Sequence, residues 1–205
     1  SAYDAYSLLV EAGGKRLFYS GDFRGHGRKS ALFERMLRNP PADVDVLLME
    51  GSSIGRLKAG EGFPTETDLE SELGTLMDET PGMVLAYASG QNIDRVWILF
   101  RVCKRKGRTL IVDLYTAEIL RATGNGRIPQ GWWDGMRVFL PFRQRVWVKR
   151  KELFDLIPPY QDNRIFPEEL NEIASRATML FRPSMTEDLT RADCLSGARV
   201  VWSMW

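Results

Sequence analysis

The residues best suited to chemistry are carboxylates that follow predicted strands. Asp22 follows the β-rich run 15–20, in the glycine-rich loop Gly21-Asp22-Phe23, and Glu50 ends the apolar run 45–50. A carboxylate has two oxygens and a negative charge, so it can bridge two metal ions. A glycine-aspartate pair is also an ordinary turn sequence. The hairpin before Asp22 and the acidic strand end after it favour a functional role for Asp22 over that of a simple turn residue.

Two further polar residues are expected near Asp22. Asp4 precedes the strand predicted over 6–11, and antiparallel pairing would bring it to the same sheet edge as Asp22. It would support a metal ligand there, or simply be a solvated residue. His26 is the only histidine of the chain; it is either an exposed loop residue or a contact for substrate. We expect Asp4, Asp22 and Glu50 to converge on one rim.

A phosphate site is predicted at the start of the helix expected over 91–105. The preceding sequence, Ser89-Gly90-Gln91-Asn92, can cap the helix and present its free N–H groups to an anion. Arg95, one turn into the helix, favours a phosphate, whereas Asp94 opposes one. Because every helix has such an end, Ser89 and Arg95 are weak candidates on their own.

Two clusters of basic residues are the remaining binding candidates. The first comprises Arg101, Lys104, Arg105, Lys106 and Arg108, and its position at a helix C-terminus is explained by the helix dipole. The second comprises Arg143, Arg145, Lys149, Arg150 and Lys151, with Phe142 and Trp147 interleaved. Basic and aromatic side chains together suit single-stranded nucleic acid. A solvated surface explains this second cluster equally well, and we take Arg143 and Arg145 as its RNA-binding candidates.

The composition describes a folded protein without a dominant charge. Of 205 residues 44% are apolar, which suffices for a core, and 28 basic against 27 acidic residues give a net charge of +1. Such a charge predicts no strong attraction to nucleic acid or to membranes beyond local patches. No apolar run approaches the roughly 20 residues that span a bilayer. Two cysteines make no disulfide framework, so we expect a cytoplasmic location. A homo-oligomer is left open.

The elements that position these residues predict an α/β fold in two parts, 1–62 and 63–205. Strands are expected at 6–11, 15–20, 45–50, 83–86, 109–113, 138–140, 145–148, 179–181 and 199–202. Helices are expected around 32–37, 67–77, 91–105, 117–121, 152–157 and 167–176, with a short one near Glu187. In the second part the alternation predicts a mainly parallel sheet.

Several of these predictions are specific enough to be tested. The near-continuous apolar run 45–50 indicates a strand covered on both faces, and the run 199–202 also reads as a buried strand. Thr67-x-x-Glu70 fits a capping box. Strand 83–86, helix 91–105 and strand 109–113 form a βαβ unit, which places the two strands side by side.

Taken together, these motifs resemble the metallo-β-lactamase superfamily. Ser1-Ala2-Tyr3-Asp4, the hairpin and Gly21-Asp22-Phe23-Arg24 resemble the second half of such a domain. The strand ending in Glu50-Gly51-Ser52 resembles the acidic first motif of the β-CASP branch, which includes ribonuclease J-like and mRNA 3′-end processing enzymes. The sequence 88–95 is similar to the start of the first β-CASP crossover helix.

The resemblance implies part of a metallo-β-lactamase αββα domain over 1–62, followed by a β-CASP-like α/β domain over 63–205. It implies that Asp22 bridges two zinc ions and that the substrate is RNA or another phosphodiester. The metal-binding His-x-His-x-Asp-His motif is absent, as are the downstream histidine motifs. The chain also stops inside the apolar run 199–205, and we expect missing sequence on both sides.

The implied function is therefore that of an incomplete metal-dependent phosphodiesterase or ribonuclease. Two alternatives stay open, a small-molecule metallo-hydrolase of the same fold and a binding module without catalytic activity. The sequences flanking this segment would distinguish them.

We predict that the chain by itself does not cleave RNA. One histidine cannot supply the roughly three protein ligands of a catalytic zinc site. Incubation with zinc or manganese should release no product from a labelled RNA or a phosphodiester dye. Metal-dependent cleavage that disappears in Asp22→Ala would contradict this prediction.

Overall fold

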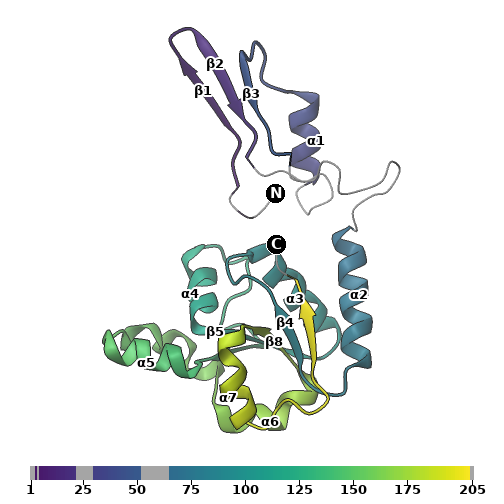
Figure 1. Ribbon diagram of the computed structural model, residues 1–205, viewed down its shortest axis with the longest axis vertical. Coiled ribbons are helices and arrows are strands. Elements are labelled where there is room, and N and C mark those ends of the chain that lie inside the picture. The colour runs from purple at the N-terminus through teal and green to yellow at the C-terminus, as the bar shows by residue number, and fades with distance from the viewer. Residues whose placement is uncertain (1–2, 4, 22–29, 52–64, 204–205) are drawn as a thin grey trace. The chain divides into compact units, whose positions relative to one another are not determined.

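The chain divides into two compact units, which are described separately below. The computed structural model describes residues 3, 5–21, 30–51 and 65–203 (Figure 1). The units are Ser1–Leu69 and Glu70–Trp205. The boundary predicted near residue 62 lies outside the described residues.

The first unit is built on the predicted hairpin. Strands β1 (Leu8–Ala12) and β2 (Lys15–Tyr19) pair antiparallel, and the turn residues Gly13 and Gly14 have φ of 56° and 73°. Glycine adopts such conformations without strain, so the Gly-Gly sequence favours this tight hairpin turn. Helix α1 (Ser30–Arg38) follows in the chain.

Strand β3 (Val46–Leu48) extends this sheet, pairing parallel with β2 in the order β1-β2-β3. Asp45 anchors its start by accepting hydrogen bonds from the Lys15 ammonium at 2.6 Å and from the backbone N–H of Arg16 at 2.8 Å. The Lys15 bond, with that backbone bond, lowers the pKa of Asp45. The prediction that both faces of this strand are covered is wrong for the described residues, because all three strand residues are exposed. A continuous apolar run shows that the residues are hydrophobic, but it does not show whether another element covers them.

The second unit contains a six-stranded sheet in which every pair is parallel, as predicted. Its strands are β4 (Val84–Tyr87), β5 (Thr109–Asp113), β6 (Met136–Phe139), β7 (Arg164–Ile165), β8 (Ala177–Phe181) and β9 (Arg199–Trp202).

Helices cover both faces of this sheet. They are α2 (Glu66–Glu79), α3 (Ile93–Arg105), α4 (Leu114–Ala122), α5 (Phe142–Arg150), α6 (Leu170–Ile173) and α7 (Thr186–Arg191). Five short 3₁₀ segments also occur, at Phe154–Leu156, Pro158–Asn163, Pro167–Glu169, Ala174–Arg176 and Pro183–Met185.

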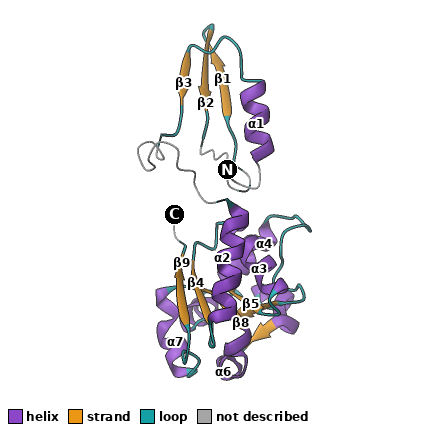
Figure 2. Ribbon diagram, turned by 90° about the vertical axis from the view of Figure 1, so that its right-hand side faces the viewer, coloured by secondary structure: helices purple, strands orange, loops and turns teal. Residues whose placement is uncertain are grey.

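Alternation along the strands divides the core between the two faces. Leu85, Ile111 and Met179 point to one face, where Leu170 of α6 and Leu189 of α7 cover them. Their neighbours along the strands are also buried, as are the inner residues of α3 and α4. Figure 2 shows α3 and α4 on one side of β4 and β9, and α7 on the other.

The strand order is β7-β6-β5-β8-β4-β9. The predicted βαβ unit exists and its strands are parallel, but they are not neighbours, because β8 lies between β4 and β5. All but the last residue of β8 are buried. The apolar sequence of this strand is typical of a buried strand, but it carries no information about which strands flank it.

Three local predictions are wrong. The segment 145–148 is helical within α5, not extended. Strand β9 lies at the sheet edge, so it is exposed: Val200 and Trp202 are 61% and 67% exposed. The capping box of α2 is formed by Thr65 and Asp68, whose backbone and side-chain groups bond reciprocally at 2.8 and 3.2 Å. The hydrogen bonds to Thr65 also lower the pKa of Asp68.

Arg108 holds the amino-terminal ends of the strands together. Its side chain is 9% exposed and donates to the carbonyl oxygens of Met77 and Thr80 at 2.8 and 2.6 Å, and of Gly82 and Ala177 at 3.2 and 3.1 Å. Burial lowers the pKa of this guanidinium, but arginine stays charged in proteins. The helix dipole therefore does not explain this member of the first basic cluster.

The two cysteines are buried and free. Burial raises the pKa of Cys103 to about 12 and also raises that of Cys194. Both thiols are therefore protonated and shielded at neutral pH, as is usual for a cysteine that packs as a small buried hydrophobe. No helix in the described parts of the chain has the length and apolar character needed to cross a bilayer.

We predict that Arg108→Met destabilises the chain by about 3 kcal/mol or more. Methionine keeps the apolar stem but leaves buried carbonyl groups without donors. Urea unfolding followed by circular dichroism measures the loss. Arg176→Met is the control, because that side chain is exposed and its loss should cost within about 0.5 kcal/mol. Equal stability of the two variants would contradict the prediction.

Candidate functional site

The carboxyl ends of β2 and β3 form one edge of the first unit's sheet. There Ser20 is hydrogen bonded to the segment that precedes β1 and to the end of β3 and the residues after it. It is 3% exposed; its N–H donates to Leu48 O at 2.9 Å, and its hydroxyl accepts the Glu50 N–H at 3.2 Å. The hydroxyl of Ser7 donates to Ser20 O at 2.8 Å. A Cβ on Gly21, where φ is 61°, would lie 2.6 Å from Tyr6 O, so glycine is required there.

This edge is where the predicted carboxylates would meet. Glu50 is half-buried, and its backbone bonds to Ser20 as described. Asp4, Asp22 and His26 lie outside the described residues. Their chain neighbours Tyr6 and Gly21 contact each other at this edge. The predicted convergence of Asp4, Asp22 and Glu50 therefore stays a prediction, while the segments next to each of them do converge.

In the second unit, a polar network occupies the carboxyl ends of the central strands. Asp113, 1% exposed at the end of β5, accepts hydrogen bonds from Thr116 N at 2.9 Å and from Gln144 Nε2 at 2.7 Å. Arg182, just after β8, places its Nε 3.1 Å from the same carboxylate. Carboxyl ends of parallel strands are where ligands bind in open α/β sheets, and this network fixes the arginine there.

The loop after β4 packs closely onto this network. A Cβ on Gly90 would lie 2.3 Å from Thr116 Oγ1 and 2.7 Å from Arg182 Nη2, so only glycine fits. The Arg182 guanidinium lies over the Tyr115 ring, 5.0 Å from its centroid. Gln91 Nε2 donates to the Tyr115 hydroxyl at 2.7 Å. These contacts tie together the ends of β4, β5 and β8.

Ser89 and Arg95 lie at this edge, at the start of α3. The N-cap is Asn92, whose side chain accepts from Arg95 N at 3.0 Å. The Ser89 hydroxyl accepts from Gln91 N at 3.2 Å, within its own turn. The predicted capping is therefore confirmed. Arg95 is half-buried, and the phosphate contact remains a prediction.

Arg143 and Arg145 lie on α5, which follows β6 at the same edge. Asp188 of α7 caps this helix by accepting the Phe142 N–H at 3.0 and 3.2 Å. The same carboxylate lies 3.3 Å from Arg145 Nη2, so the charge of Arg145 is partly offset. Arg143 and Trp147 are exposed. The second basic cluster is thus the surface of an exposed helix that contains no acidic residue.

The structure therefore brings all four predicted phosphate contacts of the second unit to one sheet edge. Strands β4 and β6 are three strand positions apart, which corresponds to about 14 Å. Sequence reasoning missed Asp113, Arg182 and Gln144. Asp113 ends a buried strand and Arg182 follows one, which is the same signal that singles out Asp22 and Glu50.

The described residues do not form a metal centre. No group of three or more histidine, cysteine, aspartate or glutamate residues is placed to bind an ion within the described ranges. A zinc site of the kind the resemblance implies needs about three such ligands.

The comparisons with known proteins support the fold alone. No protein-family model matches the chain, and no curated protein sequence is similar to it. A crystal structure of a protein of unknown function from Enterococcus faecalis V583 has a TM-score of 0.60 and 17% sequence identity. The similarity covers 100% of this chain and 50% of that one, so this chain spans about half the length of the matched protein.

We predict that Asp113→Asn destabilises the chain by about 2–4 kcal/mol, because it leaves Arg182 without a charge partner and presents an amide to the Gln144 donor. Glu79→Gln is the matched control. Glu79 pairs with Arg199 at 3.3 Å on the surface, where both side chains are about half exposed, so its loss should cost under about 1 kcal/mol. Urea unfolding measures both, and equal losses would contradict the assignment of Asp113 as the anchor of Arg182.

Proposed function

We propose that this chain is part of a metal-dependent phosphodiesterase that acts on RNA. In this proposal the first unit belongs to a metallo-β-lactamase-fold domain and supplies Asp22 as a ligand for zinc. The second unit is a β-CASP-like domain that holds the RNA. The observation that carries the proposal is the convergence of the segments next to Asp4, Asp22 and Glu50 around Ser20.

A stable hairpin does not need acidic segments to meet at one edge. Carboxylates gathered there would repel one another unless cations or hydrogen-bond donors were present. Such an arrangement therefore supports a site for metal ions. The residues to hold them would be Asp22, with Glu50 and Asp4 beside it, together with histidines that this chain does not contain. When bound, two such ions would generate hydroxide and stabilise charge on the scissile phosphate.

The described ligand set is incomplete, so we derive no catalytic step for this chain. Its own residues support the binding of substrate instead. At the carboxyl edge of the second unit, Arg182 is oriented by Asp113, and α5 presents Arg143, Lys149 and Arg150 to solvent. Several basic side chains in one unit suit binding to the successive phosphates of a nucleic acid strand. The half-length match to the bacterial protein is consistent with a chain that works within a larger protein.

A second candidate is an RNA-binding module without catalytic activity. It is favoured by the single histidine of the chain and by the lack of a metal-binding group among the described residues. The two functions differ in one property. The phosphodiesterase proposal requires a divalent cation to associate with Asp22, and the binding module does not.

We therefore predict that Mn²⁺ binds weakly at Asp22 and broadens nuclear magnetic resonance signals at both strand ends. In isotope-labelled protein, the amide signals of Tyr6, Gly21 and Glu50 should broaden together, because all three lie at this edge. Asp22→Asn should abolish the effect, since a neutral amide binds the ion far more weakly.

The matched control is Asp43→Asn. Asp43 is an exposed aspartate at the opposite end of β3, with a φ of 52° that asparagine also tolerates. This variant should leave the broadening unchanged. Broadening that persists in Asp22→Asn, or that is centred on Asp43, would refute the metal-site proposal and leave the binding module.

A further inference from the structure

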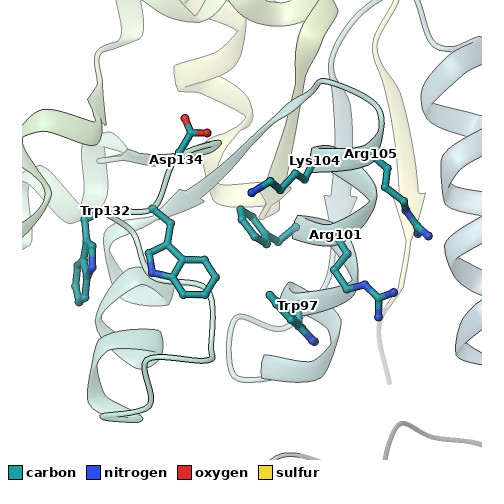
Figure 3. Close-up of a pocket in the computed structure, with 8 residues that line it drawn as sticks. Trp97, Arg101, Lys104, Arg105, Trp132 and Asp134 are labelled. Carbon is teal, nitrogen blue, oxygen red and sulfur yellow. The ribbon is translucent and has the colours of Figure 1, made fainter.

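A second surface of the Glu70–Trp205 unit combines aromatic rings with an exposed cation. It is an open groove of about 670 Å³ between α3 and the loop that precedes β6 (Figure 3). Its lining residues are Trp97, Phe100, Arg101, Lys104, Arg105, Trp132, Trp133 and Asp134. Because α3 runs back from the end of β4 to the start of β5, most of the groove lies away from the carboxyl edge described above.

The aromatic wall is held in place by ring contacts. Trp97 stacks on Phe100 with centroids 6.0 Å apart and planes at 12°, and Trp133 lies 6.4 Å from Trp97 and 5.6 Å from Phe100. Phe100 is 5% exposed, whereas Trp97 and Trp133 are half-buried. The indole rings of Trp97 and Trp133 are therefore packed against other rings on one side and exposed to the groove on the other.

Trp132 extends this wall and is 44% exposed. It stacks on Tyr160, with centroids 6.1 Å apart and planes at 23°. Tyr160 is buried, and its hydroxyl donates to Glu118 at 2.6 Å. A Cβ on the preceding Gly131 would lie 2.7 Å from the Tyr160 ring, so the loop sits as close to that ring as a backbone can. An exposed indole fixed in this way loses little conformational entropy when a ligand stacks on it.

The charges of the groove are not all neutralised within the protein. Arg105 and Arg101 lie 2.6 and 3.4 Å from the carboxylate of Glu70, which is 8% exposed. Figure 3 shows both arginines extending away from the Trp132–Asp134 loop, whereas Lys104 extends toward it. Counting Glu70 and Asp134 against the three cations leaves the groove with a charge of +1.

We propose that this groove binds single-stranded RNA. Bases would stack on the exposed indoles of Trp132 and Trp133, and the Lys104 ammonium would pair with a backbone phosphate. Stackable aromatic faces beside a cation are the features that bind single strands without reading sequence. Aromatic grooves also bind proline-rich peptides, but the positive charge favours an anionic ligand. The choice of RNA as the single strand rests on the proposed function, whereas the groove itself is argued from its own residues.

The test is fluorescence anisotropy of a labelled ten-nucleotide uridine RNA titrated with the full chain. Trp132→Leu and Lys104→Gln should each weaken binding by about 5- to 10-fold, which is within the range of a lost base stack or phosphate contact. Trp132→Phe, which keeps a π face, should restore most of the affinity lost in Trp132→Leu. Circular dichroism and the inaccessibility of the buried cysteines check that each variant is folded.

The controls remove an exposed indole and an exposed cation elsewhere in this unit. Trp202→Leu removes an indole that is 67% exposed on β9, and Arg176→Gln removes an exposed cation. Both should bind RNA as the unaltered chain does. RNA binding that is unchanged in Trp132→Leu and Lys104→Gln, but weakened in Arg143→Gln, would overturn the groove and leave the carboxyl edge as the RNA site.

Two further outcomes separate this inference from the proposed function. Groove-dependent RNA binding without Mn²⁺ broadening at Asp22 would support the groove and refute the metal site. Binding of a proline-rich peptide at Trp132, with no binding of RNA, would overturn the groove proposal. A deoxyuridine DNA of the same length serves as the last arm, and equal binding of DNA and RNA is expected from stacking and phosphate pairing alone.

Discussion

The arrangement of the parallel sheet depends on one buried guanidinium. Arg108 precedes β5 and donates to carbonyl oxygens at the end of α2, before β4 and at the first residue of β8. Arginine carries five donors in a rigid planar fork, so a single side chain can satisfy several carbonyl groups that approach from different segments. It therefore fixes β4, β8 and β5 relative to one another at their amino ends. At the other end of these strands lie Ser89, Arg182 and Asp113, so the same side chain determines where the polar network forms.

The Glu70–Trp205 unit presents cations on two surfaces with different chemistry. At the carboxyl edge, the arginines are oriented by buried carboxylates: Asp113 holds Arg182 and Asp188 holds Arg145. At the groove, rigid aromatic rings predominate and Lys104 is the cation directed into it. The edge suits the recognition of phosphate at a fixed position, and the groove suits sequence-independent contact with bases.

Sequence patterns predicted the helices and strands better than the contacts that these elements make with distant residues. Periodicity located the hairpin, the parallel strands and α3, because each depends on local residues and on burial. Helix α5 was missed, since its first N–H is capped by Asp188, 46 residues later in the chain. The strand order could not be predicted either, because β8 enters the sheet between two strands that precede it in sequence.

The same limit, that contacts between distant residues cannot be predicted from sequence patterns, applies to the candidate sites. Sequence identified Ser89, Arg95 and Arg143 by residue type, and all three lie at one sheet edge. It could not identify which cations are neutralised, because the partner of Arg105 is Glu70, 35 residues earlier. That pairing is what distinguishes Lys104 from its neighbours in the first basic cluster. Asp4, Asp22 and His26 are candidates because of the chemistry of their side chains.

The convergence of Asp22 and Glu50 is the central claim, and the distance between these positions tests it most directly. Spin labels can be attached at Asp22→Cys and Glu50→Cys, because the native cysteines are buried, and their separation measured by electron paramagnetic resonance. The reference pair is Ala42→Cys with Glu50→Cys, at opposite ends of β3 and up to about 26 Å apart if that segment is extended. The account predicts that the 22–50 separation is clearly shorter than the 42–50 separation. A 22–50 separation equal to or longer than the reference would contradict the metallo-β-lactamase interpretation.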